Sequence, residues 1–143
     1  MSFHSIAEAC RKHAFIHPDK ICVIDGSGAY TYAQMWHRAN QLCRTISGMG
    51  INSQDRIAVE CTQNADFLFM AMACQIGKFI FVPVERSVGR NRVNEICCET
   101  DAKMLIQDTG YELSIKIPIL SFEQLEKKNR RMTPVSPGKR KTL

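Results

Sequence analysis

The sequence predicts an α/β protein in which a layered parallel sheet is flanked by helices and preceded by an N-terminal β-hairpin. From residue 56 onward, short apolar runs that suit strands alternate with segments of helical periodicity. The links between these segments are short, as expected for right-handed crossovers between parallel strands. Apolar residues make up 45% of the 143 residues, a proportion typical of a folded domain with a core.

The first elements are a helix and a hairpin. Apolar residues recur at helical spacing over Phe3–Phe15. The runs Ile21–Ile24 and Ala29–Tyr32 flank Asp25-Gly26-Ser27-Gly28, whose residue types favour a tight turn. We therefore expect a hairpin after the first helix.

A second helix is predicted over Tyr32–Ser47. Thr31 and Gln34 have the spacing of a capping box, and Gly48 and Gly50 mark its end. The stripe expected to face the core is Ala33, Trp36, Ala39, Leu42, Cys43 and Ile46. Trp36 is thus predicted to be a core residue.

The remaining elements follow a strand–helix–strand pattern. Asn64 suits the cap of a helix that is apolar on nearly every face and is therefore expected to be buried. Phe79–Val84 is continuously apolar, as in a strand covered on both faces. Ser121 and Gln124 begin a final helix with a second capping box. The other predicted elements are strands at Arg56–Glu60, Lys103–Ile106 and Ile117–Leu120 and a helix at Arg90–Glu99.

Charge divides the chain into a balanced part, residues 1–129, and a basic tail, residues 130–143. Residues 1–129 hold 14 basic and 14 acidic residues, so the net charge of +5 comes from the tail. The tail has no periodicity and is expected to be flexible. A nucleic-acid-binding domain would carry its charge on a folded patch, so we expect no nucleic-acid partner. With no apolar run of membrane-spanning length and no signal peptide, we expect a cytoplasmic protein.

Gly26 and Gly28 raise the alternative of a dinucleotide-binding loop. The G-x-G-x-x-G fingerprint needs a third glycine for close packing of helix on strand, and this position holds Thr31. Asp55 lies at the distance expected for the ribose-binding acid, but it precedes an apolar run rather than ending one. A Rossmann-like nucleotide-binding domain remains the least favoured alternative.

The seven cysteines are scattered, and no C-x-x-C pair is present. We expect reduced, mostly buried thiols. Cys10, His13 and His17 have a spacing that could place three metal ligands along one helical face. Pro18 predicts that the helix ends before His17, so no metal site is expected.

The order of several short motifs resembles the opening of the AMP-forming adenylating ligases, which include acyl-CoA synthetases, luciferases and peptide-synthetase adenylation domains. No single motif is specific, but the ordered set covers about residues 3–126, and CoA ligases of fatty acids or other small carboxylates look nearest. The matching residues are Pro18, Thr31-Tyr32, Gly50-Ile51 with Asp55-Arg56-Ile57-Ala58-Val59, Asn64 through Gly77, Val82-Pro83, and Asp101-Ala102-Lys103 before Met104-Leu105-Ile106.

This resemblance implies a fold and a reaction. The chain would be an incomplete N-terminal subdomain of an enzyme that joins a carboxylate to AMP with ATP and Mg²⁺, then transfers the acyl group to CoA or another thiol. The family's phosphate loop and its later magnesium, ribose and lysine motifs are absent before Leu143. We therefore assign no catalytic, cofactor-binding or metal residue and expect the chain alone to be inactive.

Two groups of basic residues remain as weaker phosphate-binding candidates. In the tail, Val135 and Pro137 depart from the family's phosphate loop, although Thr133, Ser136, Gly138, Lys139 and Lys141 can be matched to it. Arg86, Arg90 and Arg92 suit a CoA phosphate or, more simply, the solvated side of a helix.

The expected partner is a second copy of the chain or a longer ligase chain. The family's remaining residues normally cover this part, so its apolar faces would otherwise stay exposed. A non-enzymatic interaction module that pairs with a full-length ligase is accordingly the second hypothesis.

Overall fold

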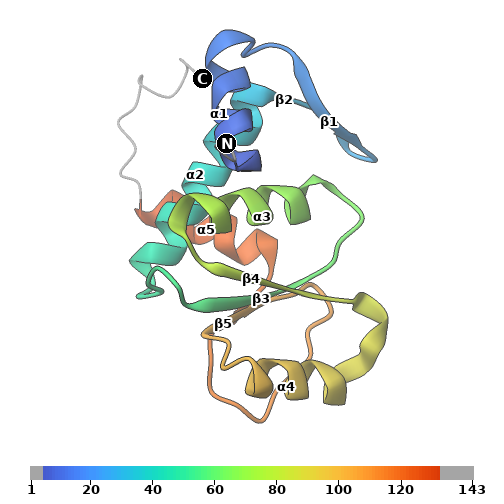
Figure 1. Ribbon diagram of the computed structural model, residues 1–143. Coiled ribbons are helices and arrows are strands. Elements are labelled where there is room, and N and C mark those ends of the chain that lie inside the picture. Colours follow the sequence, from blue (N-terminus) through green and yellow to red (C-terminus); the bar gives the residue numbers. More distant parts are fainter. Residues whose placement is uncertain (1–4, 133–143) are drawn as a thin grey trace.

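The computed structural model describes residues 5–132 and has three layers (Figure 1). A parallel sheet lies between α2, α3 and α5 on one face and α4 on the other. The helices are α1 (Ile6–Ile16), α2 (Tyr32–Gly48), α3 (Ala65–Gly77), η1 (Arg86–Val88), α4 (Gly89–Glu99) and α5 (Phe122–Met132). The strands are β1 (Ile21–Asp25), β2 (Gly28–Thr31), β3 (Arg56–Glu60), β4 (Ile80–Val84), β5 (Met104–Ile106) and β6 (Ile119–Leu120).

The strands form two sheets. β1 and β2 make the antiparallel hairpin, and the main sheet has the parallel order β4-β3-β5-β6. In the register of the main sheet, Ala58 lies opposite Val82 on one side and Leu105 on the other. The α/β fold with a parallel sheet and an N-terminal hairpin is therefore confirmed.

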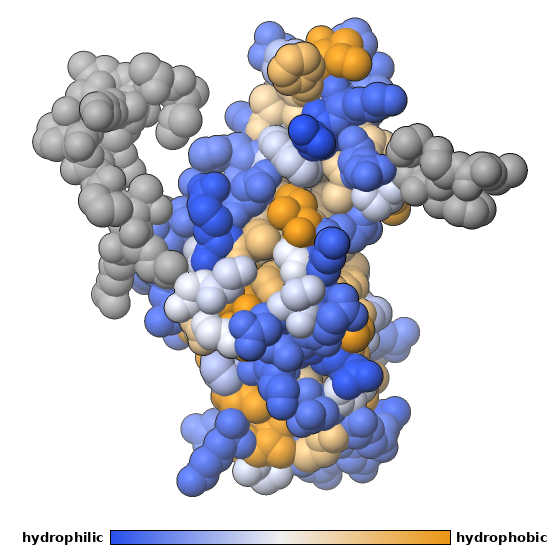
Figure 2. Space-filling view, turned by 60° about the vertical axis from the view of Figure 1, so that its left-hand side comes forward, coloured by the Kyte–Doolittle hydropathy of each residue, from blue (hydrophilic) through white to orange (hydrophobic). Residues whose placement is uncertain are grey.

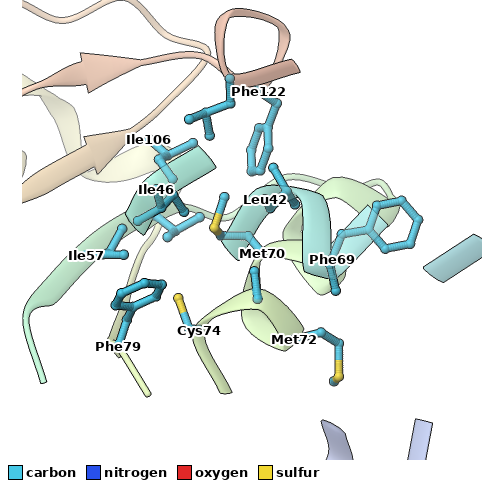
Figure 3. Packing of buried hydrophobic residues seen from close by; sticks show 14 of the residues in the cluster. Leu42, Ile46, Ile57, Phe69, Met70, Met72, Cys74, Phe79, Ile106 and Phe122 are labelled. Atoms are coloured by element: carbon cyan, nitrogen blue, oxygen red, sulfur yellow. The ribbon is translucent and has the colours of Figure 1, made fainter. Parts of the chain in front are cut away.

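Side-chain alternation along β3 divides the core into two clusters. Ile57 and Val59 point to the face covered by α2, α3 and α5, whereas Ala58 packs toward α4. Figure 3 shows the larger cluster, where Met70 of α3 lies among residues of the sheet and α2. Ile57, Ala58 and Val59 have no exposed surface, and neither does any residue of β5, so these two central strands are covered on both faces.

Local hydrogen bonds fix the helix starts much as the sequence predicted. Thr31 and Gln34 form the expected reciprocal capping box of α2. The Oδ1 atom of Asn64 accepts from the amide of Asp66 at the start of α3. Ser121 and Gln124 form the second box, with bonds of 2.8 and 3.1 Å. These bonds satisfy amides that a helix leaves without internal partners.

The prediction that Phe79–Val84 is covered on both faces is only partly right: Phe81 packs against the larger cluster and Val82 and Val84 against the smaller one, but other residues are exposed. β4 begins at Ile80 and is an edge strand whose only paired neighbour among residues 5–132 is β3. Ile80 is 36% exposed and Pro83 is also exposed, because no strand lies beyond them. Pro83 suits this position, since proline cannot donate a bond within a central strand.

Two other expectations need adjustment. The buried face of α2 is formed by Met35, Ala39, Leu42, Thr45 and Ile46, so Trp36 lies beside the core rather than within it. Helix α5 continues to Met132, past the expected start of the tail at residue 130. The rest of the tail lies outside the described residues.

Helix α3 is buried, as predicted, and the cover comes from this chain. Gln75 is its one exposed residue, and the Oε1 atom of Gln75 accepts a 2.9 Å bond from the Ala7 amide of α1. A side chain at Gly77 would overlap the ring of Phe79, so glycine permits the tight passage from α3 into β4. The apolar faces of α3 therefore do not need a second chain.

Candidate functional site

Polar side chains gather where β3 and β5 end, at the carboxyl edge of the main sheet. Ligands of open α/β sheets bind outside this edge, which makes it the first place to look for a site. β3 ends at Glu60 and β5 is followed by Gln107, and these two residues are buried at 3% and 4% exposure. A buried carboxylate is costly unless it is paired, so its partners define the local structure.

Glu60 is held by two segments, the loop after β5 and the short helix η1. Its Oε2 atom lies 2.8 Å from the hydroxyl of Thr109, and its Oε1 atom lies 3.4 Å from the Asp108 amide. The guanidinium Nε of Arg86 is 3.8 Å from Oε1, and the Arg86 side chain is largely exposed to solvent. The contact to Thr109 is the shortest of the three, and a hydrogen bond to a carboxylate is stronger than one between neutral groups.

Gln107 organises the loop that follows β5. Its side-chain nitrogen Nε2 donates a hydrogen bond of 2.8 Å to the backbone carbonyl oxygen of Tyr111. Its Oε1 atom lies 3.2 Å from the Thr109 hydroxyl, which has one hydrogen and donates either here or to Glu60. The cluster Glu60, Gln107 and Thr109 therefore fixes this loop against the end of the sheet.

Two of the three arginines considered for phosphate binding, Arg86 and Arg92, are engaged with carboxylates of the chain, whereas no such contact within residues 5–132 supports or excludes Arg90. Arg86 faces Glu60, and Arg92 lies 3.0 Å from Glu95 and 3.6 Å from Glu99. The hydrogen bond to Glu95, with the nearby Glu99 charge, raises the pKa of Arg92. A phosphate would have to compete with these acids, which favours the solvated-helix interpretation for Arg92.

The glycine loop is a turn organised by Asp25. Its Oδ1 atom accepts from the amides of Ser27 and Gly28 at 2.8 and 3.2 Å, and Oδ2 accepts from the Ala65 amide at 2.8 Å. These bonds, led by the one from the Ser27 hydroxyl, lower the pKa of Asp25. The amides that a pyrophosphate would need already serve this carboxylate, and Gly28 supplies a φ of 144° for the turn.

The residues considered as metal ligands are not arranged as a site. Cys10 is buried, whereas His17 is the C-cap of α1 and its ring stacks on that of His13 with centroids 6.2 Å apart. Within residues 5–132, no three side chains of His, Cys, Asp or Glu are placed to hold a metal ion.

A groove of about 830 Å³ lies between α1 and α2. Trp36 and Phe15 form part of its apolar lining, and Arg11, Lys12 and Arg44 contribute positive charge. This groove explains why Trp36 is only partly buried despite its helical spacing. Its volume is within the range of small-molecule sites, but it contains none of the carboxyl-edge cluster.

Sequence reasoning missed the cluster around Glu60. The available signal was a charged residue placed directly after the buried run Ile57-Ala58-Val59. Thr109 is distant in sequence, so its contact with Glu60 could be found only from the fold.

The tail residues from Thr133 onward that were matched to the phosphate loop lie outside the described residues. No helix within residues 5–132 combines the length and apolar character needed to cross a bilayer.

Comparison with known proteins places these features in context. The sequence profile described as AMP-binding enzyme matches residues 10–139. The chain is 29% identical over 117 residues to the medium-chain fatty-acid–CoA ligase of Escherichia coli (strain K12), covering 81% of this chain and 21% of that protein. It is 25% identical over 117 residues to the 2-succinylbenzoate–CoA ligase of Oceanobacillus iheyensis, covering 80% of this chain and 24% of that protein. The chain thus spans a quarter or less of these relatives.

Solved structures share the fold at low sequence identity. VinN superposes with a TM-score of 0.82 at 15% identity, covering 94% of this chain and 40% of that one. The N-terminal subdomain of NpsA from Klebsiella oxytoca gives 0.78 at 15% identity, with coverages of 96% and 34%. MenE from Bacillus subtilis in complex with AMP gives 0.76 at 14% identity, with coverages of 82% and 32%.

Proposed function

The chain belongs to the AMP-binding enzyme family, and we propose that it forms the N-terminal part of an adenylating acid–thiol ligase. The observation that supports this proposal most directly is the profile match over residues 10–139. Family membership implies use of ATP, and the reaction we propose joins a carboxylate to AMP with Mg²⁺ before transfer to CoA or another thiol. The CoA ligases among the relatives support this reaction class.

In this proposal residues 5–132 build a scaffold and do not perform the chemistry. The carboxylate of Glu60 is occupied by Thr109 and Arg86, and the Asp25 carboxylate is occupied by turn and helix amides. We assign catalysis to parts of a complete ligase that this chain does not span. The chain alone is therefore inactive in our proposal, and ATP, Mg²⁺ and CoA belong to the complete enzyme.

A pyrophosphate-release assay tests the inactivity directly. The panel contains medium-chain fatty acids, 2-succinylbenzoate and amino acids, with the Escherichia coli medium-chain ligase as the positive control. We expect release at background with every acid. Turnover that depends on one of these acids would show that this chain holds a working site.

A chimera tests the scaffold role. Residues 5–132 replace the equivalent segment of the Escherichia coli ligase, to which the chain is 29% identical. We expect the chimera to retain measurable adenylation. A chimera that folds with the circular dichroism of the parent but forms no acyl-adenylate from its fatty acid would count against the role.

The second candidate function is an interaction module that pairs with its own copy or with a longer ligase. It is favoured by β4, whose outer edge has no partner strand among residues 5–132 and whose Ile80 is 36% exposed. Figure 2 shows the apolar residues on one face in separate small groups among hydrophilic ones, so a sheet edge is the better contact surface. Light scattering should then give twice the 16.2 kDa of one chain. A monomer across the micromolar range, with no binding to the Escherichia coli ligase, would exclude both pairings.

We further propose a cytoplasmic location and a folded part that ends near Met132. All seven cysteines are free, which suits a reducing compartment. Helix α5 packs Phe122 and Leu125 into the core, so the folded part includes this helix. Localisation of a fluorescent fusion and limited proteolysis test these two statements.

A further inference from the structure

Three sulfur atoms meet at the junction of α1, β1 and α2. The Sδ atom of Met35 lies 3.3 Å from the Sγ atom of Cys10 and 3.2 Å from that of Cys22. Cys10 and Met35 are 5% and 2% exposed, whereas Cys22 is half-buried and gives the group a side open to solvent. Each sulfur comes from a different element, so the fold itself brings the three together.

The chemistry of this cluster suits a soft cation. Both thiols donate their hydrogens toward the same thioether, so those hydrogens occupy the space between the sulfurs. Thiolate and thioether ligands suit soft ions such as Cu(I), whereas the hard ions Mg²⁺, Ca²⁺ and Mn²⁺ prefer oxygen ligands. The third ligand is a methionine, so the cluster differs from metal groups built only from His, Cys, Asp and Glu.

We propose that Cys10, Cys22 and Met35 form a binding site for one Cu(I) ion. On binding, the two S–H bonds break and two Cu–S bonds form, and both protons leave to solvent. Met35 adds a lone pair without losing a proton. Copper remains Cu(I) throughout, so the step needs no oxidant or reductant, and the occupied site carries one net negative charge.

The geometry needs a small expansion to accept the metal. Metal–sulfur distances of about 2.3 Å in a trigonal arrangement place sulfurs about 4.0 Å apart. The present contacts of 3.2 and 3.3 Å therefore have to lengthen by under about 1 Å, which the flexible methionine side chain permits.

Competition with a chromophoric Cu(I) chelator under anaerobic conditions tests the site on the full chain. The variants are Cys22→Ser and Met35→Leu, and the matched control is Cys98→Ser, which alters an exposed thiol on α4. Circular dichroism confirms that each variant is folded before titration. Copper-edge X-ray absorption of the one-to-one complex then counts the sulfur ligands.

We expect the wild type and Cys98→Ser to bind one Cu(I) with the same affinity and with three sulfur ligands. Cys22→Ser should lower the affinity for the first Cu(I) ion by more than the ~10–100-fold that is typical of losing an outer-shell partner. The Met35→Leu variant should keep both thiolate ligands, so X-ray absorption should show two sulfur atoms bound to copper. The site is excluded if a folded Cys22→Ser variant binds as tightly as wild type, or if Cys98→Ser is the variant that loses the first equivalent.

Discussion

Thr109→Val should destabilise the protein although the two side chains have nearly the same shape. The substitution removes the hydroxyl that lies 2.8 Å from the Oε2 atom of Glu60. Glu60 is 3% exposed, so water has little room to replace the lost donor. The other contacts of this carboxylate are longer, at 3.4 Å to the Asp108 amide and 3.8 Å to Arg86.

These distances set the expected magnitude. A hydrogen bond to a charged group contributes about 1.5–3 kcal/mol, compared with about 0.5–1.5 kcal/mol for a neutral pair. We expect Thr109→Val to lower the free energy of unfolding by about 2 kcal/mol. With a denaturant slope of about 2 kcal/mol per molar urea, the midpoint should fall by about 1 M.

Equilibrium urea unfolding, followed by circular dichroism, measures this change. Thr62→Val is the control, because the Thr62 hydroxyl donates to the neutral amide oxygen of Asn64 in an exposed turn. We expect Thr62→Val to lower the free energy of unfolding by less than about 1 kcal/mol. Equal midpoints for the two variants would refute the view that the Thr109 hydroxyl stabilises a buried charge.

Other substitutions probe the core, the hairpin, the thiols and the tail. Leu125→Ala should lower the free energy of unfolding by about 2–5 kcal/mol and the melting temperature by about 10 °C, because Leu125 is fully buried. Asp25→Ala should lower the urea midpoint at neutral pH, where the lowered pKa of Asp25 adds stability. That stability is present above the ordinary pKa of 3.8 and lost as the pH falls through the lower folded value, so the two midpoints should converge in acid. Iodoacetamide should label exposed Cys98 well before Cys74, whose pKa burial raises to about 12, as peptide mass spectrometry would show. Truncation after Met132 should change the melting temperature by less than about 4 °C.

The order and type of the elements could be predicted because their signals are local. The capping box at Thr31 and Gln34 needs residues three apart, and the structure contains it. The buried helix at Ala65–Gly77 was likewise visible from its apolar residues alone. The family assignment followed from the order of such segments, and the profile match confirms it.

The features that the sequence did not reveal depend on contacts between distant segments. β4 looked like a central strand because its residues are apolar, but strand order is a property of the whole sheet. Trp36 had core spacing, yet Met35 fills the core and Trp36 faces the groove beside α1. The Glu60–Thr109 bond joins residues 49 positions apart, so no local pattern signals it.

The strand order also constrains how the chain folds during synthesis. β3 is made first among the main strands, but its neighbours β4 and β5 emerge later from the ribosome. Phe122 and Leu125 of α5 complete the larger cluster on the face that α2 and α3 share. While the ribosome still holds α5, that face remains open to chaperones and to other nascent chains. Slower translation before α5 would therefore lengthen the period in which this apolar face stays uncovered.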